Sequence, residues 1–594
     1  MCRILGCYNH AGLSPQIIER AIHQQIQGGP DRQSYQSGKN WMLGNNRLAI
    51  QGVMGGDQPF SVGKMHAVYN GEIYNHRALK RDLASRGYTI TDDCDGSVIL
   101  PLYEIYGEAF VEHLDGMFAI AIVDERETSK FILCNDNAAM KSVYYYADEA
   151  TGAFFFASEL VALFELPVPK KLRPTAVDEY LVGRSVWHNN TVFEGIHSLG
   201  PRSILTQDSR GKLHHKTYAS KAIAVYQEGD FLKAANQFGK LFENEVAEML
   251  NADVPVCLVT SGGLDSSYVS ALATKYRQNL ECFNVSYEGD WPSADESQFA
   301  KEVAKHCGIR YNQVLIKESE FPSLLDATIA HLGQPNSAPH SLSTYALFKA
   351  VHESGFKVAM TGDGADEFFG GYERFRNATY DQSENWLQKY FDVMCATTQN
   401  MRDTVYSKEY QGTLQGKNSV LKQAILHLQQ EVAKKGRLKT LLEFDQDERF
   451  PAYILRRVDH LSMAHSVEAR IPFCQSRITS FSTSLPSEYQ IDKMQVKKIV
   501  YEAAKPLLPQ SIINRPKHFF VLPIVEMLSR KHVLSEILND TLSSQAFRNR
   551  GYFNYEAIQD LIAEQVKNPN NNTANLLWSV MVLERWLQKM DHVK

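Results

Sequence analysis

Two patterns of hydrophobic and polar positions divide the chain. Up to about residue 200, short apolar runs rich in β-branched and aromatic residues are separated by turns. They predict strands at Ile4–Tyr8, Met42–Ile50, His66–Tyr69, Phe118–Val123, Phe131–Cys134 and Phe154–Ala157. Helical spacing of apolar residues occurs at Arg77–Arg86 and Val98–Tyr106. Many strands with interspersed helices predict a layered α and β architecture.

Further along, strands and helices alternate regularly. The apolar runs predict strands at Val254–Val259, Leu280–Ser286, Asn312–Ile316 and Lys357–Met360. Between them, helical spacing occurs at Phe231–Leu250, Leu264–Tyr276 and Glu296–His306. This alternation predicts a doubly wound parallel sheet. From about residue 380 the chain is predicted to be mainly helical, ending in an amphipathic helix at Asn575–Met590.

A polar, irregular stretch separates the two patterns. It extends from about residue 200 to 235 and includes Gln207–Lys212. We therefore place the domain boundary near residue 205. The first domain is expected over residues 2–205 and the second over residues 230–594.

Composition excludes some classes of partner. The net charge of −6 gives no basic surface for nucleic acid and no polybasic patch for a membrane. The sequence has no run of roughly 18 apolar residues and no secretory signal, so no membrane association is expected. Nine cysteines without a CxxC pair favour reduced thiols in a cytoplasmic protein.

The strongest local motif is the run Ser261–Ser267, which reads SGGLDSS. It joins a predicted buried strand to a helix. Its two glycines let the backbone curl around an anion, and the helix N-terminus adds unpaired N–H groups. A carboxylate at Asp265 fits phosphate only if it holds a metal ion, so the run predicts a phosphate and metal site. A glycine turn without a ligand is the alternative.

A second glycine-rich turn follows the predicted strand that ends at Met360. The run Thr361–Tyr372 contains three acidic residues within five positions, Asp363, Asp366 and Glu367. Acidic side chains packed together repel one another unless a counter-charge is present. A nucleotide with magnesium would supply that charge, whereas an exposed acidic loop would need none. The chain has no Walker A motif and no GxGxxG fingerprint.

Cys2 is the third candidate. If Met1 is removed, the thiol and the α-amino group belong to one residue, and the amine can take the thiol proton near neutral pH. A cysteine at this position means little alone. It gains weight from the runs Asn46–Leu48, Gly56–Phe60 and Asn70–Asn75, and from Asp95.

With these runs the chain resembles a known family. Cys2 with Asn70–Asn75 is similar to class II glutamine amidotransferases, and SGGLDSS is similar to the pyrophosphate loop of ATP pyrophosphatases. Together with the GDGADEFFGGY run, the whole pattern resembles glutamine-hydrolysing asparagine synthetases. Further matches are Phe156–Leu160, Val458–Ala464, Glu468–Phe473 and Arg515–Lys517. The resemblance implies an α+β N-terminal-nucleophile (αββα) glutaminase domain, followed by an α/β doubly wound ATP-pyrophosphatase domain with a helical C-terminal part.

The resemblance implies roles in the first domain. Cys2 would attack the side-chain amide of glutamine, while Asn70 and Gly71 would form the oxyanion hole. Glutamine itself would be bound by Arg47, Asn70, Glu72 and Asp95. Arg47 is suited to the α-carboxylate by its bidentate fork, and Asp95 to the α-ammonium.

In the second domain the resemblance implies ATP and Mg²⁺ as cofactors. ATP would contact Val259, Ser261, Gly262, Gly263, Asp265, Ser266, Ser267, Thr361 and Gly362. Asp265 and Asp366 would be the metal ligands. Lys497 would stabilise charge on the phosphate, and Asp363 stands where the family carries a glutamate near the forming amide. The acceptor carboxylate would become an acyl-adenylate, which ammonia then attacks.

The sequence departs from the family pattern at several positions. Arg3 replaces a glycine, Gln27–Asp31 replaces His-Arg-Gly-Pro-Asp, so that Gly28 replaces an arginine, and Asn135–Ser142 and Cys474–Gln475 also differ. These departures leave the glutaminase rate and the acceptor open. Aspartate is the favoured acceptor. The alternatives are another carboxylate in specialised metabolism and a non-catalytic sensor of glutamine and nucleotide. A homodimer is also left open.

Overall fold

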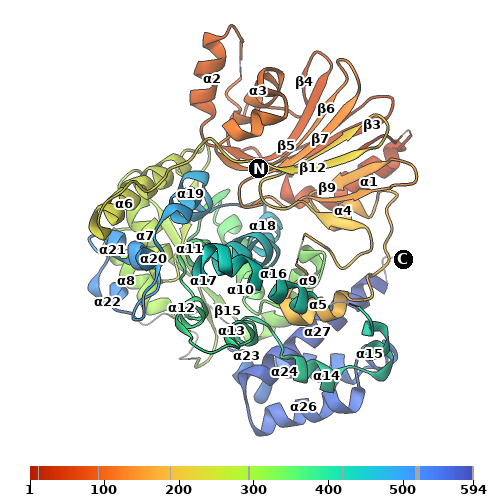
Figure 1. Ribbon diagram of the computed structural model, residues 1–594, viewed down its shortest axis with the longest axis vertical. Coiled ribbons are helices and arrows are strands. Elements are labelled where there is room, and N and C mark those ends of the chain that lie inside the picture. The colour runs from red at the N-terminus through yellow and green to blue at the C-terminus, as the bar shows by residue number, and fades with distance from the viewer. Residues whose placement is uncertain are drawn as a thin grey trace.

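Two six-stranded antiparallel sheets are stacked in the first unit of the computed structural model (Figure 1). One sheet has the order β10-β8-β9-β1-β3-β2 and the other β12-β11-β7-β6-β5-β4. The strands of the first sheet are β1 (Cys2–Tyr8), β2 (Arg32–Ser37), β3 (Trp41–Arg47), β8 (Tyr144–Ala147), β9 (Phe154–Ala157) and β10 (Ile196–Ser198). Those of the second are β4 (Phe60–Val62), β5 (Met65–Ile73), β6 (Gly116–Asp124), β7 (Lys130–Asn135), β11 (Ser203–Asp208) and β12 (Leu213–Thr217).

The structure describes residues 1–594 except 11, 91, 188, 292–294, 418, 516–521 and 592–594. Pro516 and Lys517 of the Arg515–Lys517 match therefore lie outside the described residues. All nine cysteines lie within them and are free thiols. No described helix combines the length and the apolar character needed to cross a membrane.

Strand alternation builds the layers of the first unit. Successive side chains of β1 point to opposite faces, so Ile4 packs between the sheets and Leu5 packs on the outer face. The outer face of that sheet is covered by α1 (Pro15–Gln24) and α4 (Leu160–Leu163). The other sheet is covered by α2 (His76–Ser85) and α3 (Ile99–Tyr106). The layers are therefore helix, sheet, sheet and helix.

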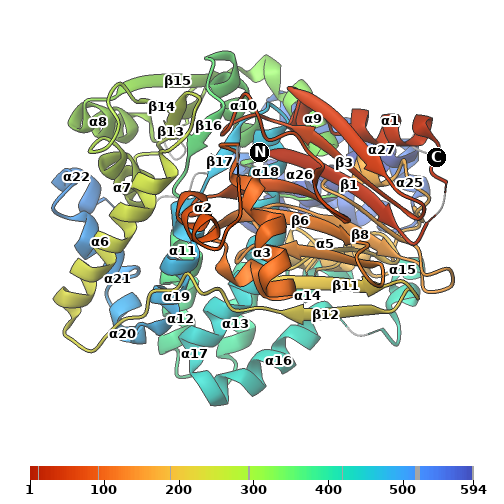
Figure 2. The ribbon, with the colours of Figure 1, turned by 90° about the horizontal axis from the view of Figure 1, so that it is seen from above.

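Five parallel strands form the sheet of the second unit, in the order β15-β14-β13-β16-β17 (Figure 2). They are β13 (Val256–Val259), β14 (Glu281–Tyr287), β15 (Arg310–Ile316), β16 (Val358–Met360) and β17 (Glu468–Arg470). The first strand of the unit, β13, lies in the centre of the sheet. The chain adds β14 and β15 on one side of it and then β16 and β17 on the other. The predicted parallel sheet is confirmed.

Helices surround this sheet and form most of the remaining chain. The first part, which surrounds β13 to β16 in chain order, comprises α6 (Phe231–Met249), α7 (Leu264–Ala273), α8 (Ser297–Cys307), α9 (Phe321–Leu332), α10 (Ser341–Glu353) and α11 (Ala365–Phe369). The middle part comprises α12 (Glu373–Tyr380), α13 (Trp386–Met394), α14 (Gln399–Val405), α15 (Lys408–Leu414), α16 (Val420–Lys435), α17 (Arg437–Phe444), a π-helical segment (Asp445–Leu455) and α18 (Arg456–Met463). The last part comprises α19 (Ser476–Ser484), α20 (Ser487–Gln490), α21 (Lys498–Ala504), α22 (Gln510–Ile513), α23 (Ile524–Ser529), α24 (Val533–Ser543), α25 (Gln545–Asn549), α26 (Tyr555–Lys567) and α27 (Asn571–Asp591). The expected helical C-terminal region is confirmed.

Strand pairing extends the first unit beyond the expected limit near residue 205. β11 pairs with β7, and β12 pairs with β11 along its whole length, so the sheet continues to Thr217. The polar composition of β12 concealed this strand, because all five of its residues are exposed at the edge of the sheet. The short strand β17 also went unpredicted, since it acquires its partner, β16, from more than a hundred residues away.

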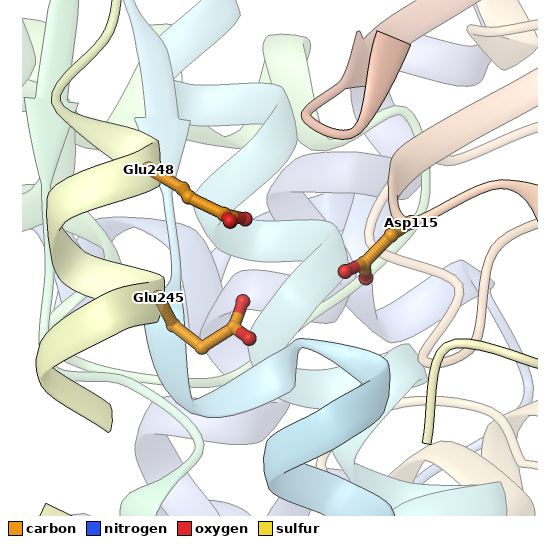
Figure 3. A group of neighbouring side chains, drawn as sticks. All are labelled: Asp115, Glu245 and Glu248. Carbon is orange, nitrogen blue, oxygen red and sulfur yellow. The ribbon is translucent and has the colours of Figure 1, made fainter. Parts of the chain in front are cut away.

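The two units meet along a surface that contains buried charge. Asp115 precedes β6 in the first unit and points toward Glu245 and Glu248 on α6 of the second unit (Figure 3). Arg477 on α19 lies 3.1 Å from Asp115, 3.0 Å from Glu245 and 3.5 Å from Glu248. Burial raises the pKa of Glu245 to about 8, and the charge of Asp115 adds to this effect while Arg477 opposes it. One arginine therefore balances three carboxyl groups only in part.

A raised carboxyl pKa makes the stability of this contact depend on pH. Protonated Glu245 contributes its full stabilisation of the folded state below the ordinary pKa of 4.5. This contribution is lost as pH rises through about 8, because the folded state must then release a proton that it holds tightly. Glu245→Gln removes this loss. We expect the difference in unfolding temperature, variant minus wild type, to be a few degrees higher at pH 8.5 than at pH 5. The half-exposed Glu243→Gln on the same helix is the control; an equal effect of Glu245→Gln at both pH values would contradict this prediction.

Candidate active sites

Cys2 lies at the start of β1, facing the end of β3. Strand register places it opposite Arg47, and its backbone nitrogen donates to Asn70 Oδ1 at 3.1 Å. Gln58 Nε2 lies 3.5 Å from the sulfur. Met1 precedes Cys2 in the described chain, with its ammonium donating to the carbonyl of Leu48 at 3.1 Å. Three segments distant in sequence thus meet at one thiol.

Asn70 and Gly71 lie next to Cys2 on the long strand β5. Asn70 is completely buried, and its Nδ2 has no hydrogen-bond partner among the described residues. A buried amide donor without a partner is costly unless a ligand accepts from it. A side chain at Gly71 would place its Cβ 2.1 Å from the carbonyl oxygen of Met117, so the close pairing of β5 with β6 requires glycine.

Arg47 and Asp95 are the two charged side chains predicted to bind the ends of an amino acid. Arg47 donates to the carbonyl of Gly52 at 2.8 Å and lies 3.7 Å from Asp57. Asp95 is buried and accepts from the backbone nitrogen of Ile73 at 2.8 Å. Arg47 lies opposite Cys2 in the strand register, and a guanidinium together with a buried carboxylate suits an amino-acid zwitterion.

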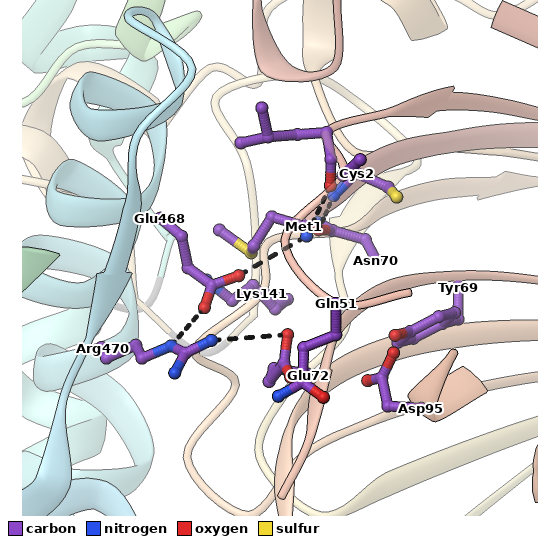
Figure 4. Close-up of polar contacts among 12 residues, drawn as sticks. Met1, Cys2, Gln51, Tyr69, Asn70, Glu72, Asp95, Lys141, Glu468 and Arg470 are labelled. Carbon is purple, nitrogen blue, oxygen red and sulfur yellow. Dashed lines mark hydrogen bonds and ion pairs between the residues drawn. The ribbon is translucent and has the colours of Figure 1, made fainter. Parts of the chain in front are cut away.

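Glu72 faces the second unit. Its carboxylate lies 3.6 Å from Arg470 Nη2, and Arg470 in turn bonds Glu468 at 2.5 Å (Figure 4). Glu468 also lies 3.5 Å from the ammonium of Met1. Burial raises the pKa of Glu72 well above its ordinary range, and the charge of Asp95 adds to this, although Arg470 opposes it. Glu468 and Arg470 matched the family pattern, but only the structure reveals that they contact Met1 and Glu72 beside Cys2.

The second site lies where β13 and β16 end. The SGGLDSS loop follows β13, and the loop Thr361–Gly364 follows β16, its parallel neighbour. The two loops touch, because a Cβ at Gly362 would lie 2.6 Å from the nitrogen of Ser266. Gly262 has a φ of +74°, and a Cβ there would lie 2.6 Å from the nitrogen of Ala300. Glycine is therefore required at both positions by close approach.

Lys497 is held between the two loops. Its ammonium lies 2.6 Å from Asp265 and 2.8 Å from Asp366, and the side chain is buried. Burial alone would lower the pKa of Lys497, but the two carboxylates outweigh it and raise the pKa. Two carboxylates at a phosphate-type loop form a donor set that suits Mg²⁺, which prefers oxygen ligands. The predicted metal ligands and the predicted lysine are thus brought together.

A cavity of about 830 Å³ opens at these loops. Ten of the predicted residues line it: Val259, Ser261, Gly263, Asp265, Ser266, Thr361, Gly362, Asp363, Asp366 and Lys497. Gly262 does not line it, and Ser267 is completely buried behind the loop. The volume lies in the range of sites that hold a nucleotide-sized ligand.

Arg457 is a further residue of this cavity, and it was not predicted from the sequence. It lies on α18, it is buried, and its Nε and Nη1 atoms have no hydrogen-bond partner in the part of the chain that the structure describes. Burial lowers the pKa of the Arg457 guanidinium, although the negative charge of Asp363 opposes this shift. An unpaired guanidinium beside a predicted nucleotide site calls for an anionic ligand. In sequence, only its place beside the Val458–Ala464 match could have drawn attention to it.

Comparison with known proteins agrees with this geometry. A family model described as Asparagine synthase matches residues 237–588, more than half of the chain. The chain belongs to the asparagine synthase family. A second model, described as Glutamine amidotransferase domain, matches residues 1–219.

Relatives of this asparagine synthase family member match over most of its length. It is 25% identical to asparagine synthetase (glutamine-hydrolyzing) 1 of Bacillus subtilis, covering 99% of this chain and 96% of the relative. It is 26% identical to Amidase chry2 of Gibberella zeae, covering 94% of each chain. It is 27% identical to Amidase chyE of Penicillium rubens, covering 85% of this chain and 84% of that one. The predicted class, a glutamine-hydrolysing ligase with ATP as the family's energy source, is confirmed.

Gly262→Ala tests the loop that follows β13. The new methyl group would meet the backbone of α8, and the positive φ would be strained by about 1–3 kcal/mol, so the loop should shift. We expect ATP-dependent synthesis from free ammonia to fall about tenfold or more, while glutamine hydrolysis is retained. Gly239→Ala, whose Cβ meets nothing closer than 3.6 Å, is the control. Full synthetic activity of Gly262→Ala would refute the assignment.

Proposed function

We propose that this enzyme transfers the amide nitrogen of glutamine to a carboxylate that ATP has adenylated, with aspartate as the acceptor and asparagine as the product. The observation that carries this proposal is the contact between the two glycine loops at the carboxyl edge of the parallel sheet. It places Lys497, Asp265 and Asp366 at one end of a cavity that is large enough for ATP and an acceptor.

Glutamine hydrolysis is assigned to Cys2. Removal of Met1 would convert the Cys2 nitrogen, now bonded to Asn70 Oδ1, into an amine that can take the thiol proton. The thiolate then attacks the side-chain carbonyl carbon of glutamine, ammonia leaves with the proton returned by the amine, and water hydrolyses the resulting thioester to release glutamate and free Cys2. The free Nδ2 of Asn70 and the Gly71 backbone would donate to the oxyanion. Arg47 and Asp95 would hold the two charged ends of the amino acid.

Carboxylate activation is assigned to the cavity. Ser261, Gly263 and Ser266 would bind the pyrophosphate part of ATP, and Asp265 and Asp366 would hold Mg²⁺, which offsets phosphate charge when bound. The acceptor carboxylate attacks the α-phosphate, pyrophosphate leaves, and an acyl-adenylate results. Ammonia attacks its carbonyl carbon and AMP leaves, with Asp363 near the forming amide. We also propose that ammonia passes from Cys2 to this cavity through the protein, because ammonia released into water would be protonated.

Among the described residues, two guanidinium nitrogens of Arg457 have no hydrogen-bond partner, which supports an acceptor with a second anionic group. Aspartate has one carboxylate to react and another to pair with a guanidinium, whereas a monocarboxylate would leave Arg457 unsatisfied. A larger carboxylate from specialised metabolism is the second candidate. It is favoured by the two relatives named amidases and by the size of the cavity, which extends to Arg184 and Asn575.

An acceptor screen tests the proposed reaction. The purified chain is given glutamine, ATP and Mg²⁺ with aspartate, glutamate, succinate or a monocarboxylate, and AMP and pyrophosphate are measured. We expect equal amounts of both with aspartate and far less with the monocarboxylate. Formation of ADP would refute adenylation, and turnover only with a larger acid would replace aspartate by the second candidate.

Arg457→Gln tests the acceptor site. Loss of a charge-assisted bond of about 1.5–3 kcal/mol should raise the KM for the acceptor about 10- to 100-fold. The KM for ATP and the glutamine hydrolysis rate should stay near wild type. The exposed Arg310→Gln serves as the control. An unchanged acceptor KM would show that this arginine does not bind the acceptor.

A further inference from the structure

Arg3 directly follows the nucleophile and contacts both units. Its Nε donates to Glu159 of the first unit at 2.8 Å, and its Nη1 donates to Asp459 of α18 at 2.8 Å. Its Nη2 lies 3.4 Å from the backbone carbonyl of Asp459. The arginine side chain is fully buried. One side chain thus joins the strand of Cys2 to a helix of the second unit.

The partners of Arg3 form a closed, balanced group. Lys141 lies 3.4 Å from the second oxygen of Asp459, so two cations face Asp459 and Glu159. Burial would raise the pKa of Asp459, but the charges of Arg3 and Lys141 outweigh it and lower the pKa to about 2. Breaking a buried pair by removing one partner leaves an uncompensated charge and is strongly destabilising for that contact. The position of α18 relative to β1 is therefore tightly specified.

The same helix borders the acceptor cavity. Arg457 and Val458 line the cavity, and the next residue is Asp459. At the other end of the contact, Arg3 is the neighbour of Cys2 on β1. This route from the cavity wall to the nucleophile therefore crosses between the units at one pair of residues, Arg3 and Asp459. A displacement of α18 on ligand binding would act directly on β1.

Gly28 makes room for Arg3. A Cβ at position 28 would lie 2.5 Å from Arg3 Cγ and 2.7 Å from its Nε. The two departures from the family pattern, arginine at position 3 and glycine at position 28, therefore lie in direct contact. In this chain the guanidinium comes from the nucleophile strand itself.

We propose that Arg3 is a positioning residue that couples glutamine hydrolysis at Cys2 to occupation of the acceptor cavity through Asp459 on α18. When ATP and acceptor order the wall formed by Arg457 and Val458, the ion pair transmits that order to β1 and aligns Cys2. The proposal rests on the proposed function of both sites. It assigns Arg3 no contact with substrate.

The experiment compares glutamine hydrolysis with and without saturating ATP and acceptor, in the full-length wild type and in Arg3→Met. The wild type should be stimulated severalfold. Arg3→Met should lose the stimulation, so that its ratio of hydrolysis rates with and without ATP and acceptor falls to about one, while AMP formation driven by free ammonia stays within about twofold of wild type. Arg20→Met, which removes an exposed ion pair of the same unit, should retain the wild-type ratio.

A second set of variants separates positioning from folding. Arg3→Lys should restore part of the stimulation, and Asp459→Asn should reproduce Arg3→Met without adding to it in the double variant. Moving the guanidinium, with Arg3→Gly and Gly28→Arg together, should recover more coupling than Arg3→Gly alone. Normal stimulation in Arg3→Met, no stimulation of the wild type, or a parallel loss of both activities that Arg3→Lys does not relieve would each overturn the proposal. Absence of AMP from the wild type with ammonia would instead refute the proposed function.

Discussion

Burial of charge at the junction of the two units is the constraint on which the arrangement depends. Arg3, Arg470 and Arg477 are each held at this junction by carboxylates from both units or from the unit opposite. A buried charge is tolerated only where its partner is fixed, so each pair specifies the relative position of the units more sharply than apolar contact would. The predicted glutamine site borders this surface, because Glu72 reaches Arg470. The two active sites are consequently parts of one closed structure.

Close approach of glycines has a comparable role within the second unit. The loops after β13 and β16 come together because Gly362 carries no side chain, and Gly262 in turn lets the first loop approach α8. Their contact brings Asp265 and Asp366 to Lys497. In the proposed reaction, Lys497 would face phosphate and the two aspartates would bind a metal ion, in place of their pairing with one another. The backbone geometry of the two loops therefore shapes this site, and its charged side chains determine which ligand it binds.

Local signals in the sequence were sufficient for much of the fold and the site. Apolar runs located β5, β6 and β13. The glycine–serine loop allowed a phosphate site to be predicted, because its backbone and side chains lie within seven residues. Long-range contacts were beyond such reasoning. The edge strand β12 is wholly exposed and reads as a loop, and β17 becomes a strand only beside β16. Arg457 and Arg3 look like ordinary surface residues until folding buries them. The resemblance to the family supplied roles for Asn70 and Asp95, but not the partners that hold them.

Direct transfer of ammonia from Cys2 to the cavity is the central claim of the proposed function. The decisive measurement supplies glutamine labelled with ¹⁵N at the side-chain amide, together with an excess of unlabelled ammonium, ATP and acceptor. Mass spectrometry of the amide product then reports the origin of its nitrogen. The account predicts a product that carries mostly ¹⁵N in the wild type and none in Cys2→Ala, which should still form product from ammonium. A wild-type product with the isotope ratio of the bulk ammonia pool would contradict it.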